Sequence, residues 1–245
     1  MDKEKLKTKY AAFDLDGTLI RWQLYHAIID ELINLNLLTS QQIQTINKYK
    51  QDWKNRRTKE SFERYEKHLI NETVRIIYKI NSDNFNQICQ NVFNIYKDQV
   101  HSYTLNLIKN LQAKNYAIFF ISGSPNNIVK LIAQYYKIDD FAGSNLNDND
   151  EKSQIIVMTG QQKLKTLKQL ITKHNLNNKD SYAVGDTLGD QYILDYVENP
   201  IAFNPNHALF NLAQSKHWKI VVERKNVNYQ LNYQDHRYVL AKTKH

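Results

Sequence analysis

The sequence predicts an α/β fold, a doubly wound parallel sheet that is interrupted after its first strand by an inserted α-helical cap. Within positions 22–99, nearly all apolar residues recur three or four positions apart, as on one face of a helix. From His101 onward, helical patterns alternate with short continuous apolar strands, as in a parallel sheet covered on both faces. Five of the six glycines and all three prolines lie beyond Asn115, so turn signals are concentrated there. We therefore expect an α/β core of residues 1–21 and 100–245 and a cap of residues 22–99.

The first strand is expected in "KYAAFDL", which begins at Lys9. The block that follows is expected to be helical, because "WQLYHAIIDELINLNLL" and "TKESFERYEKHLINETVRIIYKI" space their apolar residues three and four apart. Thr39 and Thr58 are expected N-caps, since each precedes a Gln or Glu by two or three residues.

The second part is expected to alternate helices and strands. A helix over residues 101–114 precedes the strand "YAIFFIS", a helix that opens at Pro125, a strand-rich passage to Thr159 and the helix "QQKLKTLKQLITKHN". The strand "SYAVGD", the helix "GDQYILDYV", the strand "IAF", another helix and a last strand "WKIVVE" complete the core. The polar, Tyr-rich tail after Asn226 has no predicted place in it.

Composition and charge are typical of a globular cytoplasmic protein. The longest apolar run, Tyr116 to Ile121, is far below the roughly 18 residues of a membrane-spanning helix, and "MDKEKLKTKY" does not resemble a signal peptide. The single cysteine, Cys89, suits a reducing compartment. A net charge of +8 favours phosphate-bearing partners, which include nucleic acid, acidic membrane and small phosphorylated metabolites.

Asp14 and Asp16 follow the first strand in "DLDGT". Their spacing projects both carboxylates to one side of an extended chain, and Gly17 permits a sharp turn. One carboxylate could act as a nucleophile in phosphoryl transfer and the other as a proton carrier. Two solvated residues at a strand end are the structural alternative.

Ser122 and Gly123 end a later strand in "ISGSP", directly before the expected helix at Pro125. A hydroxyl and free backbone N–H groups at a helix N-terminus form an anion site. Lys163 lies near the start of another helix, where a cation opposes the helix dipole. Its ammonium could neutralise a phosphoryl oxygen, although a solvated surface lysine, or the neighbouring Lys165 in the same role, stays open.

Asp186 and Asp190 in "GDTLGD" end a strand and open a helix. They could cap the helix, or they could hold a hard cation. Mg²⁺ takes oxygen ligands and keeps several waters, so Asp14, Asp186 and a backbone carbonyl would suffice from the protein.

In this order, "DLDGT", "ISGSP", the lysine after "TG" and "GDTLGD" resemble the motifs of the haloacid dehalogenase-like superfamily of aspartate-nucleophile phosphatases. The helical insertion after the first motif resembles the cap of its phosphoserine-phosphatase-like subgroup. The resemblance implies that Asp14 attacks phosphorus and that Asp16 is the general acid and base. The implied phosphate-binding residues are Ser122, Gly123 and Lys163.

The resemblance also implies a Mg²⁺ site. Asp14, Asp186 and the backbone carbonyl of Asp16 would hold the ion. Asp190 would support these ligands without binding the ion directly, or would reach it through water. Asp16 favours a phosphatase or phosphomutase, because dehalogenases do not need the leaving-group acid.

The sequence departs from phosphoserine phosphatases in "IRWQLYH", where an acidic residue is expected to meet the substrate ammonium. Arg21 and Gln23 stand there, which argues against an amino-acid substrate. The helical insertion should select the substrate, and its candidate contacts are Arg21, Trp22, Gln23, Tyr25, Arg56 and Arg57.

These observations predict a Mg²⁺-dependent phosphomonoester hydrolase that acts on a small phosphorylated metabolite through an aspartyl-phosphate. A phosphotransferase or phosphomutase would use the same residues with another acceptor. A nucleic-acid-binding or scaffold protein on an inactive fold is the alternative of another class, which the absence of a nucleic-acid module from the sequence disfavours. The oligomeric state stays open.

Overall fold

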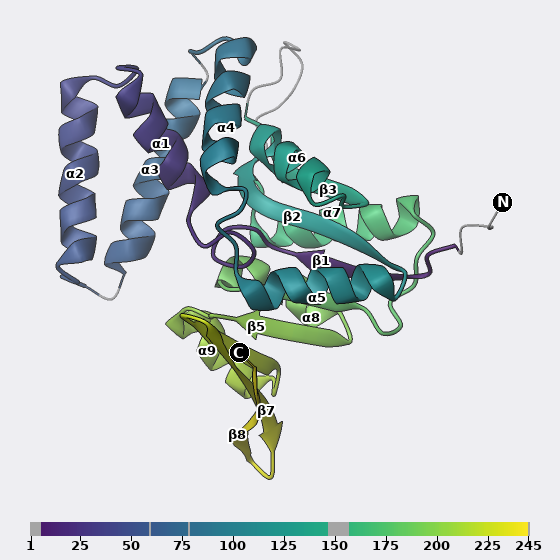
Figure 1. Cartoon of the computed structure of the whole chain (residues 1–245). Coiled ribbons are helices and arrows are strands. Elements are labelled where there is room, and N and C mark those ends of the chain that lie inside the picture. The colour runs from purple at the N-terminus through teal and green to yellow at the C-terminus, as the bar shows by residue number, and fades with distance from the viewer. Residues whose placement is uncertain (1–5, 59, 78, 147–156, 245) are drawn as a thin grey trace.

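The computed structural model describes residues 6–58, 60–77, 79–146 and 157–244, and they form one central sheet flanked by helices (Figure 1). The strand order is β3-β2-β1-β4-β5-β6-β7-β8. The strands are β1 (Lys9–Phe13), β2 (Tyr116–Pro125), β3 (Asp140–Ser144), β4 (Tyr182–Gly185), β5 (Asn199–Phe203), β6 (Lys219–Arg224), β7 (Val227–Gln234) and β8 (Arg237–Lys244). Neighbouring strands from β3 to β6 are parallel, as expected for the doubly wound core.

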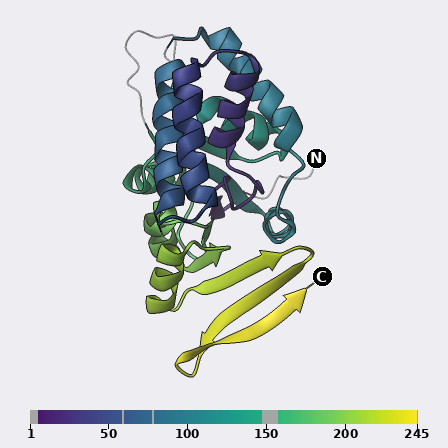
Figure 2. The same ribbon diagram turned by 90° about the vertical axis from the view of Figure 1, so that its left-hand side faces the viewer.

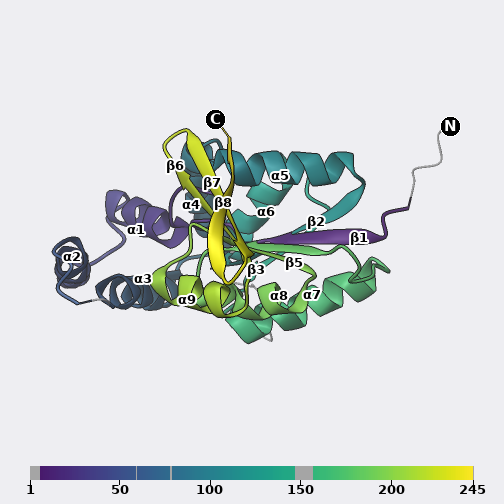
Figure 3. The same ribbon diagram turned by 90° about the horizontal axis from the view of Figure 1, so that it is seen from below.

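Alternate residues of the inner strands enter two separate hydrophobic layers. Phe13 and Phe120 belong to the layer shared with α5 (Ser102–Ala113) and α6 (Asn126–Tyr135). Ala12 and Phe119 belong to the layer shared with α7 (Gly160–Lys173), α8 (Gln191–Tyr196) and α9 (His207–Ser215). Figure 3 shows these two sets of helices on opposite faces of the sheet. The continuous apolar runs therefore reflect burial on both faces.

Four helices connect β1 to α5, and they lie beyond the end of the sheet at which β1 stops (Figure 1). They are α1 (Leu24–Asn34), α2 (Ser40–Lys54), α3 (Ser61–Ile77) and α4 (Ser82–Tyr96). Thr39 caps α2 and forms a capping box with Gln42, as predicted. Thr58 does not directly precede a helix, because α3 begins at Ser61 and the Thr58 N–H donates to the Ser61 hydroxyl.

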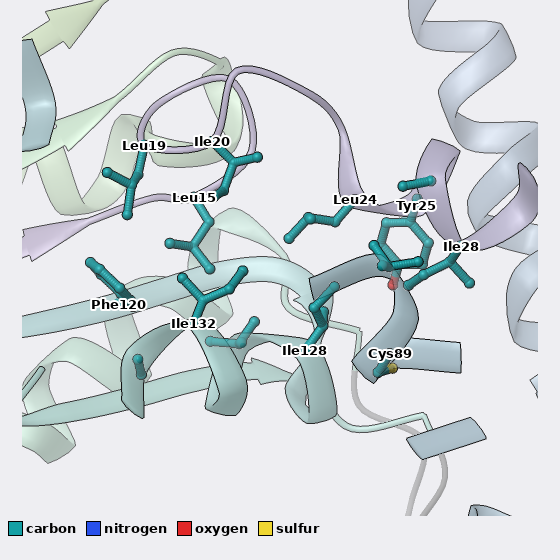
Figure 4. Close-up of a cluster of buried hydrophobic side chains, with 14 of the residues drawn as sticks. Leu15, Leu19, Ile20, Leu24, Tyr25, Ile28, Cys89, Phe120, Ile128 and Ile132 are labelled. Carbon is teal, nitrogen blue, oxygen red and sulfur yellow. The ribbon is translucent and has the colours of Figure 1, made fainter. Parts of the chain in front are cut away.

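The hydrophobic layer over α5 and α6 continues into this helical segment. Figure 4 shows Leu24, Tyr25 and Ile28 of α1 facing Ile128 of α6, with Cys89 of α4 nearby. The cysteine is free and buried. The helices α1 and α4 therefore share apolar packing with the α/β core.

The C-terminal tail, which had no predicted place, adds two strands after the last predicted strand, β6. β7 and β8 pair antiparallel and form the far edge of the sheet (Figures 1 and 2). Lys225, Asp235 and His236 take positive φ at the two turns without glycine. The Tyr238 hydroxyl lies within hydrogen-bond distance of the carbonyls of Ala213 and Trp218 and can donate to either, which ties this hairpin to the core.

The structure describes only part of the strand-rich passage expected before Thr159. The passage to Thr159 contains β3, and residues 147–156 lie outside the described part. Of the helices that the structure describes, none has both the length and the apolar character to cross a membrane.

Candidate active site

The four predicted motifs meet at one end of the sheet. Asp14 directly follows β1 and Asp186 directly follows β4, and these two strands are neighbours. Ser122 lies near the end of β2, on the other side of β1. Lys163 lies in the first turn of α7. Because the carboxyl ends of adjacent parallel strands meet at one edge, residues far apart in the sequence form one cluster.

Lys163 is the cation of this cluster. Its Nζ lies 2.7 Å from Oδ1 of Asp14 and 2.7 Å from Oδ1 of Asp190, and the residue is only 5% exposed. Burial opposes the charged ammonium, but the two carboxylates outweigh it and raise the Lys163 pKa. Lys165 is exposed on the same helix. The structure thus brings Lys163, and not Lys165, to the predicted acidic residues.

Buried negative charge exceeds the positive charge of Lys163. Burial raises the pKa of Asp14 to about 8, with Lys163 lowering it and Asp190 and Asp16 raising it further. Burial and the nearby Asp14 and Asp190 raise the pKa of Asp186 well above its usual range. An added cation would offset this excess.

A divalent cation fits the donor set. One carboxylate oxygen from each of Asp14, Asp186 and Asp190 lies within 4.8 Å of the others, and carboxylate oxygens are the ligands that Mg²⁺ prefers. Asp190 already uses Oδ1 for Lys163, and its Oδ2 accepts from the N–H groups of Asp186 and Thr187. Asp186 accepts a longer bond of 3.3 Å from the Thr18 hydroxyl. The direct metal ligands are therefore better supplied by Asp14 and Asp186, with Asp190 holding the lysine and the Asp186 loop.

Gly17 shapes the turn between the two aspartates and the rest of the loop. Its φ is +74°, and a Cβ built there would lie 2.2 Å from Oδ2 of Asp186. The Gly17 N–H donates to the carbonyl of Ile20, which closes the loop. A side chain at this position would strain the backbone and enter the carboxylate cluster.

Asp16 is held by donors from two segments. The N–H of Leu24, the first residue of α1, lies 2.5 Å from its Oδ1. The hydroxyls of Ser122 and Ser124 donate to its Oδ2 over 3.0 and 2.8 Å. Burial raises the Asp16 pKa, and these hydrogen bonds lower it in part. A raised pKa favours proton transfer from this group to a leaving oxygen.

The second motif differs from its predicted geometry. β2 continues through Pro125, and α6 begins only at Asn126, so Ser122 and Gly123 lie within the strand and not at a helix N-terminus. The Gly123 carbonyl accepts hydrogen bonds from the hydroxyls of Tyr25 and Ser144. The Ser122 hydroxyl still bonds to Asp16, and Gly123 is the next residue of the strand. Their role in binding phosphate stays a prediction.

Ser124 is a site residue that the sequence analysis missed. It is buried, and besides its bond to Asp16 its N–H donates to the Ser122 hydroxyl. The available signal was the spacing of Ser122 and Ser124, because residues two apart in a strand point to the same side.

The predicted cap residues are placed differently from one another. Gln23 is half-buried, and its Nε2 would lie 3.4 Å from a Cβ on Gly17, close to the cluster. Arg21 is exposed and lines a groove beside α5 and β6. Arg56 is exposed just after the end of α2.

The other three cap candidates make contacts of their own. Tyr25 is buried and bonded to the Gly123 carbonyl. The ring of Trp22 packs edge-on against His26, and Arg57 pairs with Asp52.

A metal-binding prediction follows from the cluster. Adding Mg²⁺ should raise the thermal unfolding temperature of the protein, because the ion binds the folded cluster and not the unfolded chain. The variant Asp186→Asn should lose most of this rise. Thermal unfolding with and without Mg²⁺ measures the effect, and Asp195→Asn, at an exposed aspartate of α8, is the matched control. An equal rise in Asp186→Asn and the unchanged protein would contradict the assignment.

Comparison with known proteins shows the family of the chain. The family model of the haloacid dehalogenase-like hydrolases matches residues 11–195. The chain therefore belongs to the haloacid dehalogenase-like hydrolase family, as its motifs predicted. No curated protein sequence matches it significantly.

Solved structures show the same fold at low sequence identity. A protein of unknown function from Bordetella pertussis Tohama I has a TM-score of 0.67 and 15% identity, with 87% of this chain and 98% of that chain covered. A structure titled as a phospho-aspartyl intermediate analogue of phosphoserine phosphatase has a TM-score of 0.60 and 17% identity, with 89% and 95% covered. A substrate-bound phosphoserine phosphatase complex has a TM-score of 0.60 and 17% identity, with 84% and 91% covered. The predicted phosphoserine-phosphatase-like architecture is thus confirmed as a fold.

Proposed function

We propose that this protein is a Mg²⁺-dependent phosphomonoester hydrolase that works through an aspartyl-phosphate on Asp14. The observation that carries the proposal is the buried arrangement of Asp14 against Lys163, with Asp16 held next to the same strand end. The family assignment and the fold shared with phosphoserine phosphatase structures support the same chemistry.

The first half-reaction transfers the phosphoryl group to Asp14. One Asp14 carboxylate oxygen attacks phosphorus, the bond from phosphorus to the leaving oxygen breaks, and Asp16 gives its proton to that oxygen. Lys163 already lies against Asp14 and would stabilise the phosphoryl oxygens. The hydroxyl of Ser122 and the backbone of Gly123 would bind the same group.

The second half-reaction returns the enzyme to its starting state. Asp16, now a carboxylate, removes a proton from water, and the water oxygen attacks phosphorus. The bond between phosphorus and Asp14 breaks, inorganic phosphate leaves, and Asp16 is protonated again. Bound Mg²⁺ would neutralise charge on the phosphoryl oxygens, with Asp14, the Asp16 carbonyl and Asp186 as its ligands and Asp190 as their support.

We propose the domain division predicted from the sequence, with residues 22–99 as the cap. The hydrogen bond from the Leu24 N–H to Asp16 supports it, because this bond joins the start of α1, at the beginning of the segment, to the predicted proton carrier. Cap movement would admit substrate and exclude bulk water. Gln23 is a candidate substrate contact, since its Nε2 lies close to Gly17 beside the cluster. Arg56 stays a prediction for contact with a small phosphorylated metabolite, whereas Arg21 lines the groove beside α5. A cytoplasmic location also stays a prediction.

Phosphate release from a panel of phosphorylated metabolites, with and without Mg²⁺, tests the function. We expect release that requires the metal and ranks the substrates. A competing alcohol in the same assay separates hydrolysis from transfer, because a phosphotransferase would form a new phosphate ester. Failure of every compound to release or transfer phosphate would contradict the proposal.

Ser124 gives a more specific prediction. Ser124→Ala should lower kcat by about tenfold on an alkyl phosphate, because Asp16 loses a hydrogen bond of 2.8 Å that orients it. The loss should be much smaller on 4-nitrophenyl phosphate, whose leaving group needs little protonation. Ser144→Ala, which removes a buried hydroxyl that bonds to Gly123, is the control and should affect both substrates equally. Equal losses on both substrates in Ser124→Ala would contradict a positioning role.

A further inference from the structure

A cavity lies beside α5, outside the catalytic cluster. It has a volume of about 520 Å³, and its walls come from α5, β6 and β7. The ring of Tyr103 on α5 stacks on Phe203 of β5, so this helix covers β5. Beyond β5, the same face of the sheet presents Glu223 of β6 opposite Asn228 of β7. The cavity is the groove between the helix and this uncovered face.

Positive charge dominates the groove. Arg21, Lys219 and Lys225 line it, and Glu223 is its one acidic residue. The Glu223 carboxylate accepts from the N–H groups of Ser102 and Tyr103, at 3.1 and 2.8 Å, and so caps α5. With that carboxylate committed to the helix, the groove favours an anionic ligand.

Amide side chains at the groove point to a ligand that also forms hydrogen bonds. Asn228 lines the groove and is 7% exposed, with its Oδ1 shielded from solvent. Asn106 and Asn110 of α5 add further amides, and Val100 and Leu107 supply apolar surface.

We propose that this groove binds a nucleoside monophosphate. The cations would bind the phosphate, the amides would bind hydroxyls and the edge of the base, and the apolar residues would contact the planar ring. A volume of about 520 Å³ lies within the range of small-molecule sites. This site differs from the catalytic cluster, because none of Asp14, Asp16, Lys163 or Asp186 lines it.

The position of the groove links it to the helical segment. Arg21 and Val100 flank residues 22–99, the Arg21 N–H donates to the Gln99 carbonyl over 2.8 Å, and Ile20 bridges to Val100. Both connections to the helices therefore pass the groove. A nucleotide held between Arg21 and β6 would restrict their movement.

Calorimetric titration of the full-length protein with AMP, without Mg²⁺, tests the site. We expect binding that weakens by about tenfold in Lys225→Glu and in Asn106→Leu, since each removes one ligand contact at the surface of the groove. Lys179→Glu, the same charge reversal at an exposed lysine before β4, should bind AMP normally. Adenosine should bind more weakly than AMP.

The titration separates this site from the catalytic one. Lys163→Ala protein that thermal unfolding shows to be folded should leave AMP binding intact, because that lysine lies outside the groove. Loss of binding in Lys163→Ala, with normal binding in the groove variants, would place AMP at the catalytic cluster and overturn the inference. Absence of AMP binding would also overturn it. Neither outcome bears on phosphate release by Asp14.

Discussion

Replacing Asp14 with asparagine should lower phosphate release by about 10⁴-fold or more, because the amide has the shape of the carboxylate but is a poor nucleophile. The fold should persist, since Lys163 keeps its second partner, Asp190, at 2.7 Å. Initial rates of phosphate release on the best substrate of the panel measure the loss. Circular dichroism and thermal unfolding check the fold.

The control for this variant is Asp195→Asn, which makes the same chemical change at an exposed residue of α8. Its rate should match that of the unchanged protein. Asp14→Asn protein that is folded and fully active would remove Asp14 from the mechanism.

Replacing Lys163 with alanine should affect both stability and rate. The variant leaves Asp14 and Asp190 buried without their shared cation, and breaking a buried ion pair in this way costs about 3–5 kcal/mol of unfolding free energy. The rate of phosphate release should fall by about 10²–10³-fold, because the phosphoryl oxygens lose a positioned charge. Urea unfolding without Mg²⁺ and steady-state assays with Mg²⁺ measure the two effects.

Lys165→Ala is the matched control, since this exposed lysine lies on the same helix and forms no ion pair with the aspartates of the described part of the chain. It should change stability and rate little. If Lys165→Ala lost the activity and Lys163→Ala kept it, the lysine that serves the site would be Lys165.

Much of the fold could be predicted because burial leaves a clear pattern in the sequence. The run "YAIFFI" places Phe119 and Phe120 in the two opposite apolar layers of β2, and such runs identify strands of a parallel sheet. β7 and β8 were harder to predict. Asp235 and His236 form their turn with positive φ and without the glycine that would have marked it.

In the candidate site, too, some residues could be predicted from the sequence and others could not. Asp14 and Asp186 could be predicted because each follows a strand directly. The contact of Ser124 with Asp16 was missed although its spacing from Ser122 was a signal, because it depends on β2 remaining extended through Pro125, where the sequence predicted that a helix opens. Local sequence identifies the strand, but tertiary packing decides where it ends.

The groove beside α5 was also beyond prediction from sequence. Arg21 was expected to contact the leaving group, and it lines a cavity with Lys219 and Lys225, some 200 residues further along the chain. Only the pairing of β6 with β7 brings Asn228 beside Glu223. Sites built across a sheet edge depend on strand order, which the sequence pattern leaves open.

Chemical trapping of the intermediate tests the central claim most directly. Protein quenched during turnover with substrate and Mg²⁺ is treated with borohydride, which reduces an acyl phosphate, and the peptide that contains Asp14 is examined by mass spectrometry. We predict homoserine at position 14 in protein that has turned over substrate, and unmodified aspartate without substrate. Rapid phosphate release with Asp14 unmodified, or with the modification at Asp16 or Asp186, would contradict an aspartyl-phosphate on Asp14.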